Sequence, residues 1–329
     1  MNKLLLNDIM KEINKSLGTS FTFGGDPSKA LIRISTGEPL LDSITGGGVP
    51  RRGNTIIFGP PSTGKTFICQ RIIASCQGLG GTAALVDAEF SYDPEWFAKS
   101  GVVIDELIHI QPDSGEQALD AVLALVKAKV DLVIVDSAAA LVPEAEVEGE
   151  MKDMQIGLQA RLLNKFFRKI GPANINTAIV IINQTRAGIG QGGPGYVPQV
   201  LAAGKGQEYF AKIILEVKKG DEIYRDGESK KKKNIPLGFY MSVYATKNKT
   251  FQPFMRCELP FYFSGDTDPI LQIFQVALSY DILTSAGAYY RFGDIQSQGR
   301  PKFLSRMKED DGLLEDITSK IKEVIADGD

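Results

Sequence analysis

The sequence is poor in the side chains that most often carry enzymatic chemistry. His109 is the only histidine in 329 residues, which excludes a histidine-based triad and a multi-histidine metal site. A general base must therefore be a carboxylate. The three cysteines are an odd number, and Cys69 and Cys76 stand seven residues apart, on one face of a predicted helix. This placement is typical of core residues and not of metal ligands.

The chain also lacks the features of a membrane or secreted protein. No apolar run approaches the roughly 18 residues of a membrane span, so we expect no membrane partner. Asp8 comes too early for a signal peptide, so we expect the chain to stay in the cytoplasm. The net charge of −3 argues against a generic basic coat for nucleic acid. Any nucleic acid must therefore bind locally.

The stretch 59–66 has the pattern of a phosphate-binding loop. A buried strand is predicted over 54–58 and a helix over 67–74, which is the context that such a loop requires. Its glycines let backbone N–H groups face the ligand, Lys65 reaches the outer phosphates, and the Thr66 hydroxyl can bind Mg²⁺. The expected ligand is a nucleoside triphosphate. The residues expected to contact it are Gly59, Pro60, Pro61, Ser62, Thr63, Gly64, Lys65 and Thr66.

Three more buried strands are predicted, over 82–89, 131–137 and 177–184, with helices between them. Strands that alternate with helices indicate an α/β fold with a parallel sheet. In such sheets ligands bind at the carboxyl ends of the strands. Glu89, Asp136 and Gln184 stand at these ends, so we expect them to converge with the phosphate loop at one edge of the sheet.

The chemistry of phosphoryl transfer suggests roles for these residues. Asp136 matches the acid that holds Mg²⁺ through water, although an acid here can also cap a helix. Glu89 is a better candidate than Asp87 to activate the attacking water, because it lies nearer the end of the strand. Trp96, the only tryptophan, can stack on the base or pack in the core.

Several segments lie outside this core. Residues 1–18 predict an amphipathic helix, followed by a linker over 19–28, so the helix packs either on its own domain or on a neighbouring copy. After Pro260 the pattern indicates a small α+β appendage. Its elements are expected as a helix over 269–278, a hairpin over 288–294 and a helix over 313–325.

Three charged or glycine-rich stretches suggest a second ligand. An acidic stretch over 144–153 leads into a helix with a basic edge, and 244–250 ends a strand with two lysines; solvated surface is the alternative for both. The stretch 185–207 has seven glycines and no acid, and it can couple a second ligand to the nucleotide. Their basic residues are Arg161, Lys165, Arg168, Arg186, Lys205, Lys247 and Lys249. Lysines 230–233 indicate the tip of a hairpin.

Further motifs accompany the phosphate loop. They are Ile34–Gly37, Leu41–Asp42, Asp87–Glu89, Gln111–Leu119, Val135–Ser137, Glu148–Glu150, Ile182–Gln184, Lys247–Lys249 and Ala286–Tyr290. With these motifs the chain resembles the RecA-type homologous-recombination ATPases, over about residues 31 to 310. The resemblance implies a P-loop ATPase core with a mostly parallel central sheet, a short N-terminal helical arm and a small α+β C-terminal domain. The implied division is 1–30, 31–260 and 261–329.

The resemblance also implies a function. It implies an ATP-dependent recombinase that forms a helical filament on single-stranded DNA, pairs it with homologous duplex DNA and exchanges strands. Such proteins act in DNA repair and the SOS response, use ATP and Mg²⁺, and work as homo-oligomers. A hexameric helicase of similar core and a structural filament switched by ATP are the alternatives.

The resemblance assigns roles residue by residue. Glu89 takes the place of the catalytic glutamate, Gln184 that of the γ-phosphate sensor, and Tyr209 that of a relay between ATP sites. Asp93 and Trp96 take the places of adenine contacts. The implied catalytic residues are Lys65, Glu89, Gln184, Lys247 and Lys249, of which the last two reach the next subunit's ATP. The candidate DNA contacts are Gly149, Met151, Arg161, Arg168, Arg186, Gly204, Lys205 and Gly206.

Overall fold

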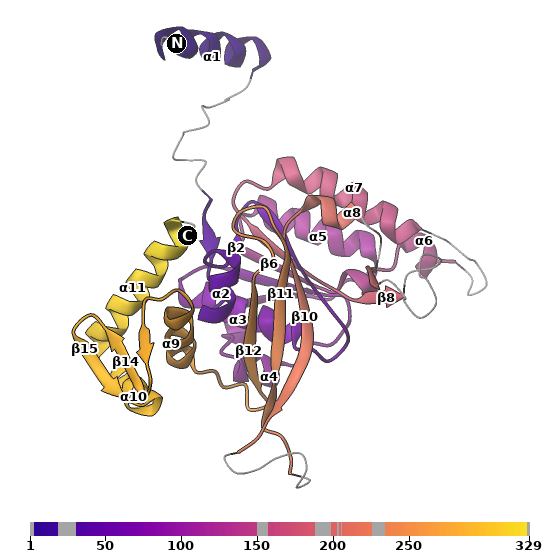
Figure 1. Ribbon diagram of the computed structural model, residues 1–329. Helices are drawn as coiled ribbons and strands as arrows, with labels where there is room; N and C mark the ends of the chain where they lie inside the picture. The colour runs from indigo at the N-terminus through magenta and orange to yellow at the C-terminus, as the bar shows by residue number, and fades with distance from the viewer. Residues whose placement is uncertain are drawn as a thin grey trace, which may run out of the picture. The chain divides into compact units, whose positions relative to one another are not determined.

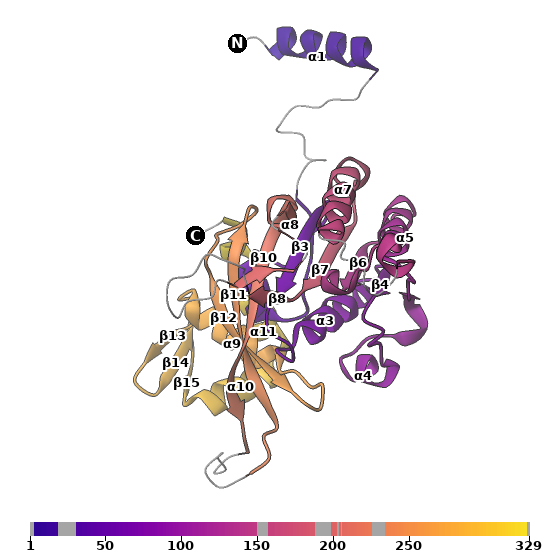
Figure 2. The ribbon, with the colours of Figure 1, turned by 90° about the vertical axis from the view of Figure 1, so that its right-hand side faces the viewer.

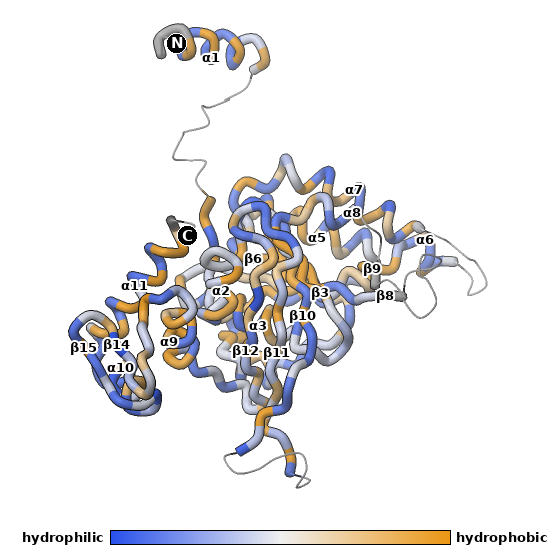
Figure 3. The backbone as a smooth tube through the Cα atoms, in the orientation of Figure 1, coloured by the Kyte–Doolittle hydropathy of each residue, from blue (hydrophilic) through white to orange (hydrophobic). Residues whose placement is uncertain are grey.

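A computed structural model describes residues 3–18, 31–149, 157–187, 199–202, 204, 206–225 and 234–327. The chain separates into two compact units, Met1–Ile32 and Arg33–Asp329. The first contains helix α1 (Lys3–Leu17), along which hydrophobic and hydrophilic residues alternate (Figure 3). Its residues Ile9, Ile13 and Leu17 are exposed. The amphipathic helix expected at 1–18 is confirmed, whereas the linker expected at 19–28 lies outside the described residues.

The second unit is organised around an eight-stranded sheet (Figure 1). The strand order is β12-β11-β10-β3-β7-β6-β4-β5, in which the strands from β10 through β5 run parallel and β11 and β12 pair antiparallel. The mostly parallel sheet is thus confirmed. The strands are β3 (Gly53–Phe58), β4 (Ala83–Asp87), β5 (Leu107–Ile110), β6 (Leu132–Asp136), β7 (Ala178–Asn183), β10 (Ala211–Ile223), β11 (Gly238–Asn248) and β12 (Arg256–Tyr262).

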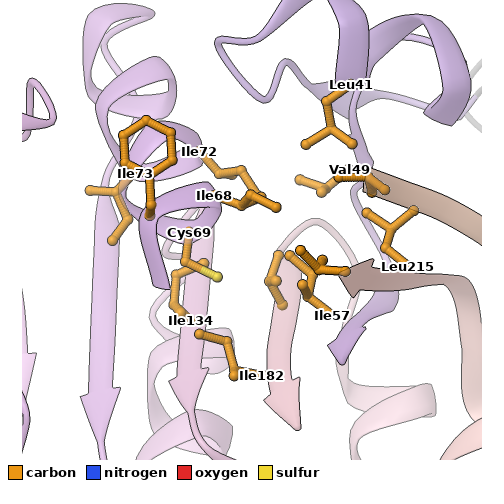
Figure 4. Close-up of a cluster of buried hydrophobic side chains, with 14 of the residues drawn as sticks. Leu41, Val49, Ile57, Ile68, Cys69, Ile72, Ile73, Ile134, Ile182 and Leu215 are labelled. Carbon is orange, nitrogen blue, oxygen red and sulfur yellow. The ribbon is translucent and has the colours of Figure 1, made fainter. Parts of the chain in front are cut away.

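Side chains alternate along the parallel strands between two hydrophobic clusters, one on each face of the sheet. On β6, Leu132 and Ile134 belong to the first cluster, and Val133 and Val135 belong to the second. All four are fully or almost fully buried. Figure 4 shows part of the first cluster, where helix and strand side chains interleave. This double burial explains why the strands are nearly continuous apolar runs.

Helices cover both faces of the sheet. The first cluster includes apolar residues of α2 (Pro39–Thr45) and α3 (Lys65–Gly78). The second includes residues of α5 (Gly115–Lys127) and α7 (Leu158–Ala173), which lie side by side (Figure 2). The shorter elements are β1 (Arg33–Ile34), β2 (Val49–Pro50), α4 (Pro94–Lys99), α6 (Glu144–Val147), β8 (Thr185–Ala187), β9 (Gln199–Leu201), α8 (Gly206–Phe210) and two 3-10 turns at Ile104–Glu106 and Ala138–Ala140.

The C-terminal segment forms a hydrophobic cluster of its own around Phe274, Phe303 and Ile317. The helix and the terminal helix expected there are confirmed. The hairpin expected over 288–294 covers only β14 and the turn after it; β15 pairs with β14 beyond that range, and β13 adds a third strand on the other side of β14. The elements are α9 (Pro269–Ser279), β13 (Thr284–Ala286), β14 (Tyr289–Phe292), β15 (Ile295–Gln298), α10 (Arg300–Glu309) and α11 (Asp311–Asp327). Within the described residues, no helix is both long enough and apolar enough to cross a membrane.

Candidate functional site

The phosphate loop joins the end of β3 to the start of α3, as the sequence predicts. At Gly59 a Cβ atom would lie 2.1 Å from the Val217 carbonyl oxygen, so only glycine fits beside β10. Gly64 has φ = 91° and precedes the helix, a conformation that favours glycine. The loop backbone is therefore shaped by its glycines, and the N-terminus of α3 faces it as an anion site.

Lys65 lies across this loop. Its Nζ donates a hydrogen bond to the Pro60 carbonyl oxygen at 2.7 Å, and the residue is only 8% exposed. Burial lowers the pKa of the Lys65 ammonium, and the charges of Asp136 and Glu89 oppose this effect. The lysine is thus held near two acids in a poorly hydrated place, where its charge interacts strongly with an anion.

Asp136 and Thr66 bring two side-chain oxygens together at the same edge of the sheet. The Thr66 hydroxyl donates to Asp136 Oδ2 at 3.0 Å, and Asp136 is 4% exposed at the end of β6. Burial and the nearby charge of Glu89 raise the pKa of Asp136 to about 7. A hydroxyl and a carboxylate suit Mg²⁺, which binds few protein oxygens and keeps water or phosphate as its other ligands. Among the described residues, no group of three or more His, Cys, Asp or Glu side chains suited to a metal occurs.

Glu89 lies at the open edge beyond β4. The strand ends at Asp87, so the expectation that it continues to Glu89 was wrong; instead the Ala88 and Glu89 N–H groups both donate to the Asp136 carbonyl oxygen. Glu89 Oε1 accepts hydrogen bonds from the Ser137 hydroxyl and, at 3.0 Å, from Gln184 Nε2. The expected convergence of Glu89, Asp136 and Gln184 is therefore observed.

Asp87 has a different environment. It is 1% exposed, and its carboxylate oxygens accept the backbone N–H groups of Ser91 and Tyr92, each at 3.1 Å. Gln111 Nε2 adds a longer bond at 3.4 Å. These contacts occupy Asp87 in shaping the turn after β4, so it is poorly placed to activate a water molecule.

A pocket of about 380 Å³ opens beside the phosphate loop. Its other walls are aromatic, with Trp96 partly buried and packed edge-to-face on Phe261, the ring centroids 6.4 Å apart. Trp96 therefore packs against the core and also lines the pocket, and its contact with a base stays a prediction. The pocket is lined by Ser62, Thr63, Gly64, Lys65, Thr66, Phe67, Trp96, Phe239, Phe261 and Phe263.

Two features beside this pocket were not apparent from the sequence. Asp93, expected beside adenine, caps α4 by accepting the Glu95 and Trp96 N–H groups at 2.9 and 3.2 Å. The wall formed by Phe239, Phe261 and Phe263 was missed. These residues lie on or directly after β11 and β12, and their pairing, such as Phe239 with Phe261, is set by strand register. No local pattern near the phosphate loop signals them.

Lys247 owes its position to a β-bulge. Ile214 on β10 pairs with Lys247, but Leu215 pairs with Ala245, so Thr246 is an extra residue in β11. A bulge changes which face the following side chains point to. Ala245 and Leu215 belong to the first cluster, whereas Lys247 lies beside Ile214, which faces the other side of the sheet.

The two lysines meet α8 on that other face. Lys247 Nζ donates to the Glu208 carbonyl oxygen, and Lys249 Nζ donates to that of Tyr209 at 3.2 Å. Burial and the neighbouring charge of Lys249 lower the pKa of Lys247. Lys247 and Lys249 line a separate pocket of about 580 Å³, which Phe58 also lines. Neither lysine lines the described wall of the phosphate-loop pocket.

The candidate DNA contacts are only partly described. Arg161, Lys165 and Arg168 are exposed on α7 while its apolar side packs in the second cluster, so the predicted basic edge is confirmed as a surface feature. Gly149 lies two residues after the end of the short helix α6 of the acidic stretch, and a Cβ at Gly206 would lie 1.7 Å from Asn164 Oδ1. Gly204 has φ = 90°. Met151, Lys205, the Arg186 side chain and lysines 230–233 lie outside the described residues.

Comparison with known proteins gives a consistent result. A family model described as the RecA N-terminal domain matches residues 4–267. Protein RecA of Thermus thermophilus is 38% identical over 327 residues, which cover 97% of this chain and 93% of that protein. Protein RecA of Mycoplasma mycoides is 34% identical over 333 residues, covering 98% and 93%. Protein RecA of Borrelia hermsii is 38% identical over 323 residues, covering 96% and 88%.

Proposed function

The chain belongs to the RecA family, and from this premise we propose which of its residues bind and hydrolyse ATP. It is an ATP-dependent recombinase and a DNA-dependent ATPase. Family membership also implies nucleotide binding, DNA binding and filament formation. The helicase and the structural filament are not supported, because relatives matched along nearly the whole chain are RecA proteins.

The proposed nucleotide is ATP with Mg²⁺. The loop from Gly59 to Thr66 binds the phosphates, with Lys65 placed against the outer ones. Thr66 and Asp136, 3.0 Å apart, hold Mg²⁺, the acid through water. The magnesium ion neutralises developing phosphate charge when bound. The base enters the aromatic pocket beside Trp96. Asp93 contacts adenine through the part of its carboxylate that does not accept the helix-capping hydrogen bonds.

Glu89 is the proposed group that orients and deprotonates the attacking water. The observation that carries the proposal is the 3.0 Å hydrogen bond from Gln184 to Glu89, since it joins the catalytic acid to the residue directly before the glycine-rich stretch. With ATP bound, Gln184 is free to contact the γ-phosphate in place of the acid. A change at the nucleotide is then transmitted directly to the backbone that leads into 185–207.

The remaining proposals concern assembly and DNA. We assign DNA contact to the following residues: Gly149, Met151, Arg161, Arg168, Arg186, Gly204, Lys205 and Gly206. Residues 1–30 act as a polymerisation arm, supported by the exposed apolar residues of α1. The core is 31–260 and the C-terminal domain 261–329. Single- and double-stranded DNA are the partners, and the cytoplasm is the proposed location.

The test uses the full chain. ATP hydrolysis is measured with and without single-stranded DNA, and the assemblies formed with ATP and DNA are imaged by electron microscopy. We expect DNA to stimulate hydrolysis and the protein to form helical filaments. Gln184→Ala should bind ATP as the wild type does, yet lose both DNA stimulation of hydrolysis and ATP enhancement of DNA binding, because these two effects are linked. Equal enhancement in wild type and Gln184→Ala would contradict the role of Gln184.

A further inference from the structure

Two fully buried amide side chains lie at the base of the glycine-rich stretch. Asn183 ends β7 and Gln207 is the second residue of α8, and they are 0% and 1% exposed. The chain between them leaves and returns as the antiparallel pair β8–β9, in which Thr185 pairs with Leu201. The two amides therefore stand at the two points where this stretch joins the core.

The side chains of Asn183 and Gln207 form one connected hydrogen-bond network, which we call the node. Asn183 Nδ2 donates to Gln207 Oε1 at 2.8 Å and to the Ala202 carbonyl oxygen at 3.1 Å. Gln207 Nε2 donates to the same Ala202 oxygen and, at 3.1 Å, to that of Gly204. Asn183 Oδ1 accepts the Gln184 N–H at 2.8 Å. Both N–H groups of each amide and both amide oxygens are thus used, so the node has one satisfied arrangement.

The node also fixes the backbone of Gln184. Its N–H is bound by Asn183, and its carbonyl oxygen accepts the Ala202 N–H at 3.0 Å. Ala202 is in turn held by Gln207. On the other side, α8 is anchored on α7, where Phe210 stacks on Phe167 with ring centroids 5.4 Å apart.

We propose that Gln207 is a positioning residue for coupling between nucleotide and DNA. It holds the returning end of the glycine-rich stretch in register with Gln184, so a movement of the Gln184 side chain on ATP binding displaces β8 and β9 together. Without Gln207, the Gly204 carbonyl oxygen loses this donor and the Ala202 carbonyl oxygen keeps only the donor from Asn183, so the returning end is held less firmly to Gln184. This inference rests on the proposed function, in which Gln184 responds to ATP and the stretch binds DNA.

The test compares two buried glutamines. Gln207→Met removes the amide while keeping an unbranched side chain of similar length. Gln77→Met is the matched control: Gln77 is also buried, and its amide exchanges two hydrogen bonds with the Val103 backbone, at 2.9 and 3.0 Å. It lies in the last turn of α3, far along the chain from the glycine-rich stretch. Both variants lose the hydrogen bonds of a buried side-chain amide, but only Gln207→Met disrupts the node.

The measurement is the affinity for fluorescent oligo-dT, with and without a non-hydrolysable ATP analogue, at one salt concentration because phosphate contacts make the affinity salt-dependent. The ratio of the two affinities is the coupling. We expect Gln207→Met to reduce this ratio by about fivefold or more, within the usual range of coupling energies. Gln77→Met should keep the wild-type ratio despite a comparable fall in melting temperature.

The outcomes separate the inference from its premise. A wild-type ratio in Gln207→Met, or an equal loss in Gln77→Met, would overturn the positioning role while leaving the proposed function intact. No coupling in the wild type itself would instead overturn the proposed link through Gln184. If Gln207→Met does not fold, Gln207→Glu decides, since it keeps the shape and the Oε1 acceptor but loses both donated bonds; it must also reduce the ratio.

Discussion

Glu89 and Asp87 stand two residues apart, and their surroundings suit them to different work. Glu89 is exposed at the edge of the sheet beside the phosphate loop, and its carboxylate is bound only by side chains, whereas Asp87 is buried and accepts two backbone N–H groups of the following turn. Side-chain donors can rearrange when a nucleotide binds. Backbone donors in a turn cannot do so without unfolding it.

The first prediction separates these two acids. Glu89→Gln keeps the shape but cannot accept a proton, so hydrolysis should fall by about 10²-fold or more while ATP still binds. Asp87→Asn places an amide against backbone N–H groups and should lower the free energy of unfolding by about 1–3 kcal/mol. Steady-state hydrolysis and urea unfolding measure the two effects. If only Asp87→Asn lost hydrolysis in a stably folded protein, the choice of Glu89 would be wrong.

The second prediction uses Trp96 as an internal probe. It is the only tryptophan of the chain, and it lines the pocket beside the phosphate loop. A base entering this pocket displaces water from the indole, so its emission should shift to the blue when an ATP analogue binds. Lys65→Ala, which removes the phosphate-binding charge, should need a much higher analogue concentration for the same shift. Unchanged emission at saturation, verified with a labelled nucleotide, would place the base elsewhere.

At the scale of secondary-structure elements, the local sequence pattern predicts the structural features that depend only on residues within one segment. The phosphate loop between β3 and α3 could be predicted because glycine positions and apolar run length are local properties. The edge strand β5 could not, since it has four residues and Ile108 is 41% exposed. The side of the sheet on which Lys247 lies could not be predicted either, because the bulge at Thr246 arises from the register of β11 against β10.

The site divides in the same way. Glu89, Asp136 and Gln184 could be predicted to converge because parallel strands bring their carboxyl ends to one edge. The aromatic wall depends on how β11 and β12, far along the chain, align beside α4. The node of Asn183 and Gln207 likewise joins residues 24 positions apart across the glycine-rich stretch. Such contacts are properties of the packed fold and have no signature in either segment alone.

The third prediction concerns the contact between α2 and α9. Glu38, at the start of α2, is 0% exposed; it pairs with Arg71 at 2.6 Å and accepts a hydrogen bond from Gln272 of α9. Gln272→Met removes this donor and the acceptor for the Leu40 N–H. The free energy of unfolding should fall by about 1–3 kcal/mol in urea titrations. Gln275→Met, in the same helix but only half-buried, should change it little.

The same carboxyl gives a pH dependence. Burial raises the pKa of Glu38 above its ordinary 4.5, against the opposing effects of the hydrogen bond from Gln272 and the charge of Arg71. The folded state therefore holds this proton to higher pH than the unfolded state, so its contribution to stability is lost as pH rises through the folded pKa. Gln272→Met raises that pKa further, and its stability deficit should grow between pH 4.5 and neutrality. A deficit that is constant with pH would show that Glu38 is not the group affected.

At the scale of the whole molecule, the lysine pair and the phosphate loop occupy different places in one chain. The loop leads into α3 on the first face of the sheet, whereas Lys247 and Lys249 bind α8 carbonyl oxygens on the other face. Register places Lys247 level with Ile56, before the strand reaches the loop. If these lysines stabilise charge on ATP, the ATP belongs to the next subunit of the filament.

The last prediction tests this with mixed filaments. Lys249→Ala keeps its own Glu89 but lacks the lysine that it would present to a neighbour, and Glu89→Gln has the reverse defect. We expect neither variant to hydrolyse ATP well alone. Random mixing in a filament creates about one interface in four where an intact Glu89 meets an intact Lys249, so hydrolysis should rise above that of either variant.

Lys65→Ala mixed with Glu89→Gln is the control, because both defects lie in the phosphate-loop site of one chain and no interface becomes complete. Assembly is verified by electron microscopy. If ATP hydrolysis recovers in the first mixture and not in the second, the lysines act between subunits. If it recovers in neither mixture, the lysines act only within their own chain.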